Sequence, residues 1–248
     1  MATTLFRSLT EKDKNEAIAR LIEESTPRDD FFLMTILAVS MATLGLLLNS
    51  TAVIIGSMLI APLLSPILST SLGVVMADPR LIYRSFYTIG KAILWSVPTA
   101  AIISLLFHSQ AGLTSELNPE ILARLEPSMI NMMVAIVAGI AASFAMIKPQ
   151  INASLPGVAI SVALIPPLAV TGIGLSRFDW AIMSDSFLLF LLNAIAIVFA
   201  SLVVFSLMNM YVKRPLADKT VEKEDKKLEQ EKAQAQHMSE LQKTKTLS

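Results

Sequence analysis

The chain has 248 residues, of which 54% are hydrophobic and only 16% are charged, and its 20 lysine and arginine residues balance 20 aspartate and glutamate residues. Ordinary soluble domains carry about 25% charged residues, so this composition is typical of a multi-pass membrane protein. The absence of cysteine excludes disulfides, thiolate metal sites and thiol nucleophiles.

The N-terminal segment, residues 1–30, is too charged for a secretory signal and is predicted to remain in the cytoplasm. A helix predicted over residues 10–25 places four apolar side chains on one face: Ala17, Ile18, Leu21 and Ile22. We therefore expect an amphipathic helix. Its two alternatives are a solvated helix, which we favour, and a helix that lies on the membrane surface.

The central part of the chain, residues 31–212, is predicted to form the transmembrane domain. A spanning helix needs about 20 mostly apolar residues, and six segments are predicted to span: 31–48, 52–77, 92–107, 129–147, 157–175 and 187–212. The second segment would reach about 39 Å as one helix, at about 1.5 Å per residue, so it is either one long span or two half-helices. Its prolines favour the broken alternative.

The distribution of lysine and arginine predicts the orientation of these spans, because these residues are retained on the cytoplasmic side. If both termini are cytoplasmic, the cytoplasmic segments hold 18 of these residues and the outer connections hold only two, Arg124 and Arg177. We therefore expect both termini in the cytoplasm and the protein in a prokaryotic inner (plasma) membrane.

The C-terminal tail, residues 213–248, carries many charges of both signs. Val221 and Leu228 lie one heptad apart, but the repeat ends at Ala235. We expect a frayed helix or a disordered cytoplasmic tail rather than a coiled coil, with lysines that contact anionic headgroups.

The second and fifth spans each carry a proline block, IAPL at 60–63 and IPPL at 165–168, which lie 105 positions apart. Three spans surround each block, so that residues 31–107 and 129–212 form two candidate repeats. An odd number of spans in each copy predicts inverted repeats, which occur in many transporters. The fold class predicted is therefore an all-α integral membrane protein with two three-helix repeats and proline-broken second helices.

Three segments also resemble a known family: LLLNSTAVIIGSMLIAPLLSPILSTSLG, LPGVAISVALIPPLAVTGIGL and FLLFLLNAIAIVFASLVVF. They are similar to the signature blocks of the prokaryotic membrane family called domain of unknown function 389, the uncharacterised hydrophobic domain proteins. The resemblance covers residues 31–210 and implies a multi-pass membrane fold without implying a chemistry.

The proline blocks have two interpretations. In the first, they only kink spanning helices, and nearby hydroxyls bind the freed carbonyls. In the second, which we favour, two broken helices meet near the midplane and point backbone groups at a solute. The second interpretation predicts a solute path lined by Ser57, Pro62, Ser65, Pro66, Ser69, Pro166, Pro167, Thr171 and Asn193.

No aspartate, glutamate, lysine or arginine falls centrally in a predicted span, which disfavours a carboxylate proton relay or a voltage sensor. The sequence also lacks a phosphate loop, an HExxH motif, a GxSxG elbow and the aromatic-basic pattern of nucleic-acid binders. We therefore expect neither an enzyme nor a cofactor, and no nucleic-acid partner.

The predicted function is a transporter or channel for a small neutral solute or an ion. An anion would favour helix N-termini, and a monovalent cation would favour freed carbonyls. The alternative is a non-transporting membrane scaffold or assembly factor that recruits a cytoplasmic partner through its charged tail. In either case we expect contact with the lipid bilayer and a homo-oligomer.

Overall fold

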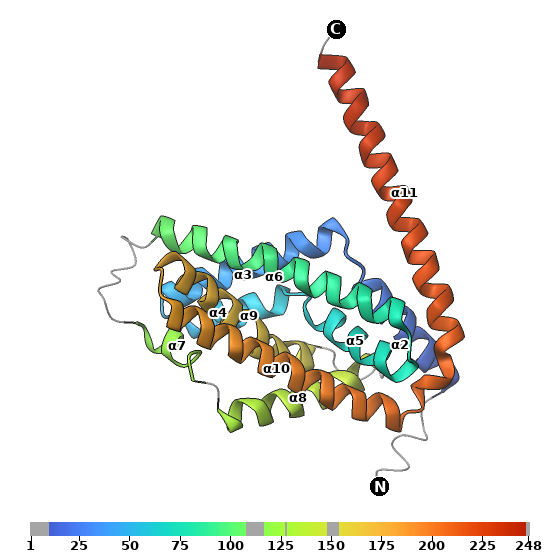
Figure 1. The fold of residues 1–248 in the computed structure, drawn as a ribbon, viewed down its shortest axis with the longest axis horizontal. Helices are drawn as coiled ribbons and strands as arrows, with labels where there is room; N and C mark the ends of the chain where they lie inside the picture. Colours follow the sequence, from blue (N-terminus) through green and yellow to red (C-terminus); the bar gives the residue numbers. More distant parts are fainter. Residues whose placement is uncertain (1–9, 108–116, 127, 148–153, 247–248) are drawn as a thin grey trace.

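The computed structural model describes residues 10–107, 117–126, 128–147 and 154–246 of the chain. All regular structure in these residues is helical (Figure 1). The α-helices are α2 (Glu11–Glu24), α3 (Asp29–Leu47), α4 (Thr51–Ile60), α5 (Leu64–Met76), α6 (Pro79–Phe107), α7 (Pro119–Leu122), α8 (Met129–Ile147), α9 (Ser154–Ser176), α10 (Trp180–Leu207) and α11 (Arg214–Thr246). A 3-10 helix, η1 (Met210–Lys213), precedes α11.

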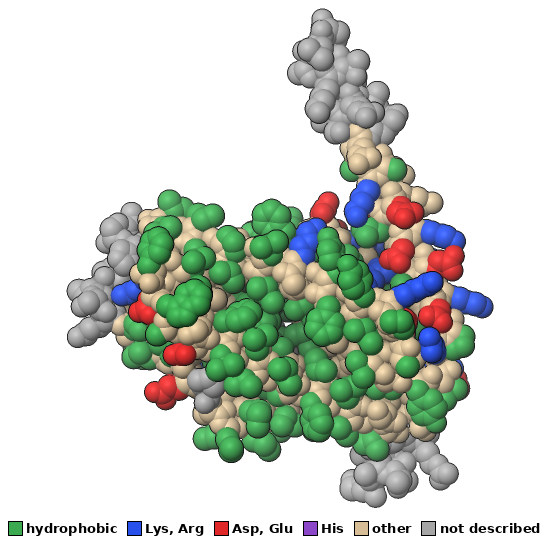
Figure 2. Space-filling view, in the orientation of Figure 1, with side chains coloured by type: hydrophobic (Ala, Val, Ile, Leu, Met, Phe, Trp, Pro, Cys, Tyr) green, Lys and Arg blue, Asp and Glu red, His purple; other side chains and the backbone are tan. Residues whose placement is uncertain are grey.

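The helices α3, α6, α8 and α10 are each long and apolar enough to cross a membrane, and the bent pair α4 and α5 would make a fifth span. Large apolar side chains are exposed along these helices, and they cover most of the face seen in Figure 2. Because such a surface suits lipid rather than water, the protein is an all-α membrane protein. Helix α9 is 23 residues long, and its part with described side chains, Leu164–Ser176, is too short to count as a span by itself.

Helix α9 lies at the centre of the bundle, in contact with α3, α4, α6, α8 and α10. The long helices run along one axis, and the charged helices α2 and α11 lie at the opposite end of the bundle from α7 (Figure 1). Lysine, arginine and carboxylate side chains gather on α11 in Figure 2. The molecule therefore has one strongly charged end and an apolar body.

The amphipathic helix expected at the N-terminus is α2, and its predicted face, Ala17, Ile18, Leu21 and Ile22, is buried. This face lies against the protein itself, because α2 packs on α5, α8 and α11. The tail is also helical, and its first turns belong to the fold, since Ala217, Val221 and Glu224 are buried.

Two predicted spans begin too late in the sequence. The span predicted at 92–107 is only the second half of α6, which starts at Pro79. The span predicted at 187–212 corresponds to α10, which starts at Trp180 and ends at Leu207. Hydropathy misses the first turns of α6 because they carry Arg80, Arg84 and Lys91, which the helix directs to its charged end.

The expected helix break is present in the first proline block. Helices α4 and α5 are bent by 52°, and the backbone at Ala61 is extended, with ψ of 122°. Pro62 lies in the break itself. Pro66 is the third residue of α5, where the backbone N–H would have no partner within the helix in any case. The break is therefore attributable to Pro62 and not to Pro66.

The second predicted break was wrong, because α9 continues from Ser154 to Ser176 through Pro166 and Pro167. A comparison of local structure explains the difference. Thr70 donates its hydroxyl to the Pro66 carbonyl at 2.9 Å, and Thr171 does the same to the Pro167 carbonyl at 2.8 Å. The same contact thus recurs at a spacing of 101 residues, and at this spacing Pro167 stands in the place of Pro66. The place of Pro62 is taken by Ala163, a residue type that does not interrupt a helix.

Three pairs of helices are joined by the same tight turn, namely α3 with α4, α5 with α6, and α9 with α10. In each turn a glycine carbonyl accepts a hydrogen bond from the backbone N–H five residues later, at 2.9, 2.9 and 3.0 Å. The residue before that donor is left-handed, with φ of 51°, 51° and 54° at Asn49, Ala77 and Phe178. These are Schellman ends, and the glycines are Gly45, Gly73 and Gly174.

The glycine is required in these turns by the helix that follows. A Cβ on Gly45 would lie 3.0 Å from the backbone nitrogen of Ile54, and a Cβ on Gly174 would lie 2.7 Å from that of Met183. The distance at Gly174 is shorter than real Cβ atoms show, and the distance at Gly45 is at the tight limit of real contacts. The turns therefore hold each pair of helices at a fixed, short separation.

Candidate functional site at the helix break

A cavity of about 860 Å³ lies beside the break between α4 and α5. One wall consists of the last turn of α4 and the first residues of α5. The other walls come from the end of α2, the start of α3 and the last turns of α8. Five of the lining residues are exposed: Arg20, Glu23 and Asp30 at the charged end, and Met34 and Leu59 on the apolar flank of α3 and α4. The cavity is therefore open at the charged end of the molecule and along this flank.

The break leaves backbone carbonyls without helical partners at this cavity. The carbonyls of Met58, Leu59 and Ile60 would bond to backbone nitrogens four residues later in an unbroken helix. Pro62 has no N–H, and the extended backbone at Ala61 turns the next residues away. All three residues line the cavity. The C-terminal end of α4, which is the negative end of its dipole, therefore borders the cavity.

The positive end of the break, the N-terminus of α5, has a carboxylate beside it. Ser65, the second residue of α5, donates its hydroxyl to Glu24 Oε2 at 2.7 Å. Glu24 also accepts a hydrogen bond from Arg20 Nε at 2.6 Å. The next residue, Ser25, donates to the Ser69 hydroxyl at 3.2 Å. The end of α2 is thus fixed onto α5.

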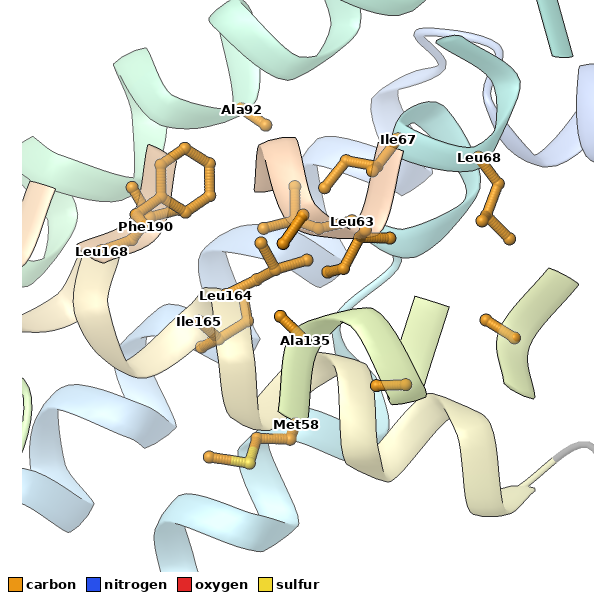
Figure 3. Packing of buried hydrophobic residues seen from close by; sticks show 14 of the residues in the cluster. Met58, Leu63, Ile67, Leu68, Ala92, Ala135, Leu164, Ile165, Leu168 and Phe190 are labelled. Atoms are coloured by element: carbon orange, nitrogen blue, oxygen red, sulfur yellow. The ribbon is translucent and has the colours of Figure 1, made fainter. Parts of the chain in front are cut away.

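The other side of the break is packed. Leu63 is buried, and it lies with Leu164 and Ile165 in the hydrophobic core (Figure 3). Leu164 and Ile165 directly precede Pro166 in α9, so the two proline blocks meet through these apolar side chains. No described residue of α9 lines the cavity. The described part of α9 therefore closes this side of the break.

The charges around the cavity come from residues that sequence analysis assigned only to a cytoplasmic segment. They are Arg20, Glu23, Glu24, Arg28 and Asp30. The available signal was the sequence EESTPRDDFF, in which charged residues and Pro27 directly precede the first span. This pattern indicates a helix end held at a membrane surface, but it does not show that the same helix folds back onto α5.

The structure separates the nine predicted path residues into three groups. Pro62 and Ser65 line the cavity. Pro66 and Ser69 lie next to it on α5, and Ser57 is buried in α4, where it donates to the Ile54 carbonyl at 2.6 Å. The remaining four, on α9 and α10, lie apart from the cavity lining: Pro166, Pro167, Thr171 and Asn193.

Thr171 lies instead at a second hollow, of about 790 Å³, between α6 and α10. Its lining is mostly apolar and includes Pro98, Trp180 and Phe187. Thr171 also forms a 3.0 Å hydrogen bond with Ser186 of α10. Its hydroxyl thus joins two helices, as expected for polar residues between helices in membranes.

Comparisons with known proteins identify the family of the chain. Residues 58–199 match a family described as "Domain of unknown function (DUF389)". An uncharacterised protein of the archaeon Methanocaldococcus jannaschii is 30% identical over 213 residues, which is 82% of this chain. The match covers 65% of that relative, so the chain spans about two thirds of its length. No solved structure matches.

Proposed function

The chain belongs to the DUF389 family, and from that premise we propose that it is a membrane transporter or channel for a small solute or ion. We propose no enzymatic reaction. The observation that carries the proposal is the cavity of about 860 Å³, which is lined by the residues of a broken helix in an apolar bundle. Irregular backbone at membrane depth is costly unless it lines a cavity or is buried in protein.

The packed side of the break, against α9, supports a gated path. The cavity is accessible from the charged end, and Leu63 with its α9 neighbours closes the other side. A transporter in one of its two access states has this arrangement. Passage of a solute requires Leu63 to move relative to Leu164, which means that the α4–α5 break opens against α9.

The proposal includes a topology of six spans with both termini in the cytoplasm of a prokaryotic cell. Helices α3, α6, α8, α9 and α10 and the broken pair α4–α5 would each cross once. We further propose that the two halves are inverted copies in the 101-residue register, supported by the matching prolines, threonines and turns. A homo-oligomer is proposed on the general ground that compact bundles bury flat apolar faces against each other.

A scaffold function is the second candidate, and one observation favours it. Helix α11 projects well beyond the bundle (Figure 1), and its described side chains after Lys227 are nearly all exposed. Deleting residues 231–248 tests this function, because it removes the projecting part and keeps the buried first turns of α11. A scaffold would lose its partner in a pull-down, whereas a transporter would keep its flux.

The transport proposal is tested by flux of a panel of small solutes and ions into proteoliposomes. Pro62→Ala supplies the N–H that the Met58 carbonyl lacks and should close the break, which would abolish flux while the protein still inserts. Pro66→Ala is the matched control, because Pro66 lies in the first turn of α5 and its replacement should leave flux unchanged. Equal flux in both variants, or no flux of any solute through the unmodified protein, would contradict the proposal.

A further inference from the structure

A broken helix has two ends of opposite polarity, and this fold treats them differently. The N-terminus of α5 attracts negative charge, and the C-terminus of α4 attracts positive charge. If the protein supplies a counter-charge at only one of these ends, the other end indicates the charge of the solute that the cavity binds.

The positive end is already compensated. The Glu24 carboxylate lies at the first turn of α5, held there by Ser65 at 2.7 Å and by Arg20 at 2.6 Å. The contact is to the Ser65 hydroxyl, so the carboxylate acts on this helix end through its charge. An anionic solute at this end would have to displace Glu24.

The negative end has no such partner. Among the residues that the structure describes, no side chain donates a hydrogen bond to the carbonyls of Met58, Leu59 or Ile60. The two arginines that line the cavity bind elsewhere: Arg20 binds Glu24, and Arg28 binds Glu224 of α11 at 2.7 Å. Among the described residues, these carbonyls therefore have no cationic side chain as a partner, and the residues that carry them line the cavity.

The charge of the cavity has the same sign as these oxygens. Two arginines and three carboxylates line it, and Glu224, outside the lining, compensates Arg28 as well. Glu23 lies 3.9 Å from Arg28 and is only weakly paired, and Asp30 lies exposed beside it. The cavity thus has an excess of negative charge, which raises the local concentration of cations.

We infer that the cavity binds a small monovalent cation at the carbonyl oxygens of Met58, Leu59 and Ile60. The inference rests on the proposed function and names its substrate class. Backbone carbonyls replace the hydration shell of monovalent cations in selective pores. A divalent cation would need several carboxylates at one point, and the described residues contain no group of three or more His, Cys, Asp or Glu side chains that could hold a metal ion.

Binding of ⁸⁶Rb⁺ to the purified protein in choline chloride tests the inference without requiring transport. We expect saturable binding that excess K⁺ displaces. Pro62→Ala should weaken it at least tenfold, because the Met58 carbonyl gains a partner, and Asp30→Asn should weaken it several-fold. Glu222→Gln, on an exposed face of α11, is the control and should leave binding unchanged. If Pro62→Ala does not fold, Rb⁺ binding to Asp30→Asn alone tests the inference.

Three results would overturn the inference: absence of saturable Rb⁺ binding, binding that both folded variants keep in full, or saturable ³⁶Cl⁻ binding in its place. The flux panel separates this failure from failure of the proposed function. Flux of a neutral solute or an anion without Rb⁺ binding contradicts the inference alone. Rb⁺ binding without flux of any solute contradicts the transport proposal alone.

Discussion

Arg28, in the connection between α2 and α3, donates a hydrogen bond to Glu224 of α11 at 2.7 Å, and so joins the two ends of the chain. The Glu224 side chain is only 4% exposed, and Lys227 also binds it, at 2.7 Å. At the next residue of α11, the buried Arg84 of α6 donates to Asp225, and it also donates to Thr26. Because Arg28 also lines the cavity, the first turns of the tail are connected directly to the candidate site.

Replacing Glu224 with glutamine should destabilise the protein, because it leaves the positive charge of Arg28 without its buried partner. We expect a loss of about 3 kcal/mol, the low end for a broken buried pair, since Arg28 is still a quarter exposed. Unfolding in detergent, followed by circular dichroism, measures the change. Glu222→Gln on the same helix breaks an exposed pair with Lys226 and should have no measurable effect. Equal stability of the two variants would show that Glu224 does not hold the tail.

Replacement by alanine should change the stability of the protein in opposite directions at two glycines with different surroundings. A Cβ on Gly172 of α9 would overlap the Cβ of Ala100 and lie 2.6 Å from the Val97 carbonyl oxygen. Gly172→Ala should therefore force α6 and α9 apart and cost about 1–3 kcal/mol. A Cβ on Gly90 meets no atom within 4 Å, so Gly90→Ala should stabilise α6 by up to about 1 kcal/mol. Thermal unfolding in detergent measures both changes, and a destabilised Gly90→Ala would contradict the packing described for α6.

Ala77 has a left-handed backbone, with φ of 51° and ψ of 43°. A side chain in that conformation costs about 1–2 kcal/mol, which glycine avoids. Ala77→Gly should therefore stabilise the protein by about 1 kcal/mol. Ala123 also ends a helix, but its φ is −61°, so Ala123→Gly should destabilise by about 0.5–1 kcal/mol. Chemical denaturation of the two variants in parallel tests the opposite signs, and a shared sign would rule out the turn geometry as the cause.

The orientation of the chain can be measured by cysteine labelling, because the chain has no cysteine of its own. Glu126 and Glu229 are both exposed and lie on opposite sides of the membrane in the six-span topology. We expect an impermeant maleimide to label Glu126→Cys in intact cells and Glu229→Cys only after permeabilisation. Labelling of Glu229→Cys in intact cells would contradict the cytoplasmic position of the tail.

Sequence patterns predicted the parts of the fold that depend on one helix at a time. The apolar face of α2 follows from the spacing of Ala17, Ile18, Leu21 and Ile22, and all four are buried. The break at Pro62 follows from the missing N–H. These features are local, because each depends on residues within a few turns of one another.

The parts that were missed depend on position within a helix or on distant contacts. IAPL and IPPL look alike, but Pro166 and Pro167 lie within a continuous helix, whereas Pro62 lies between two. The spacing of 101 residues between the two halves becomes visible only through the turn geometry at Gly73 and Gly174. The role of Glu24 also could not be predicted, since its contact with Ser65 spans 41 residues and leaves no periodic pattern in the sequence.

The tight turns also constrain how the chain enters the membrane during synthesis. Only three residues separate α3 from α4, two separate α5 from α6, and three separate α9 from α10. Three residues reach at most about 11 Å, far less than the roughly 30 Å thickness of the hydrocarbon core. The two helices of each pair therefore meet on the same side of the membrane, and each pair is oriented as one hairpin rather than as two independent helices.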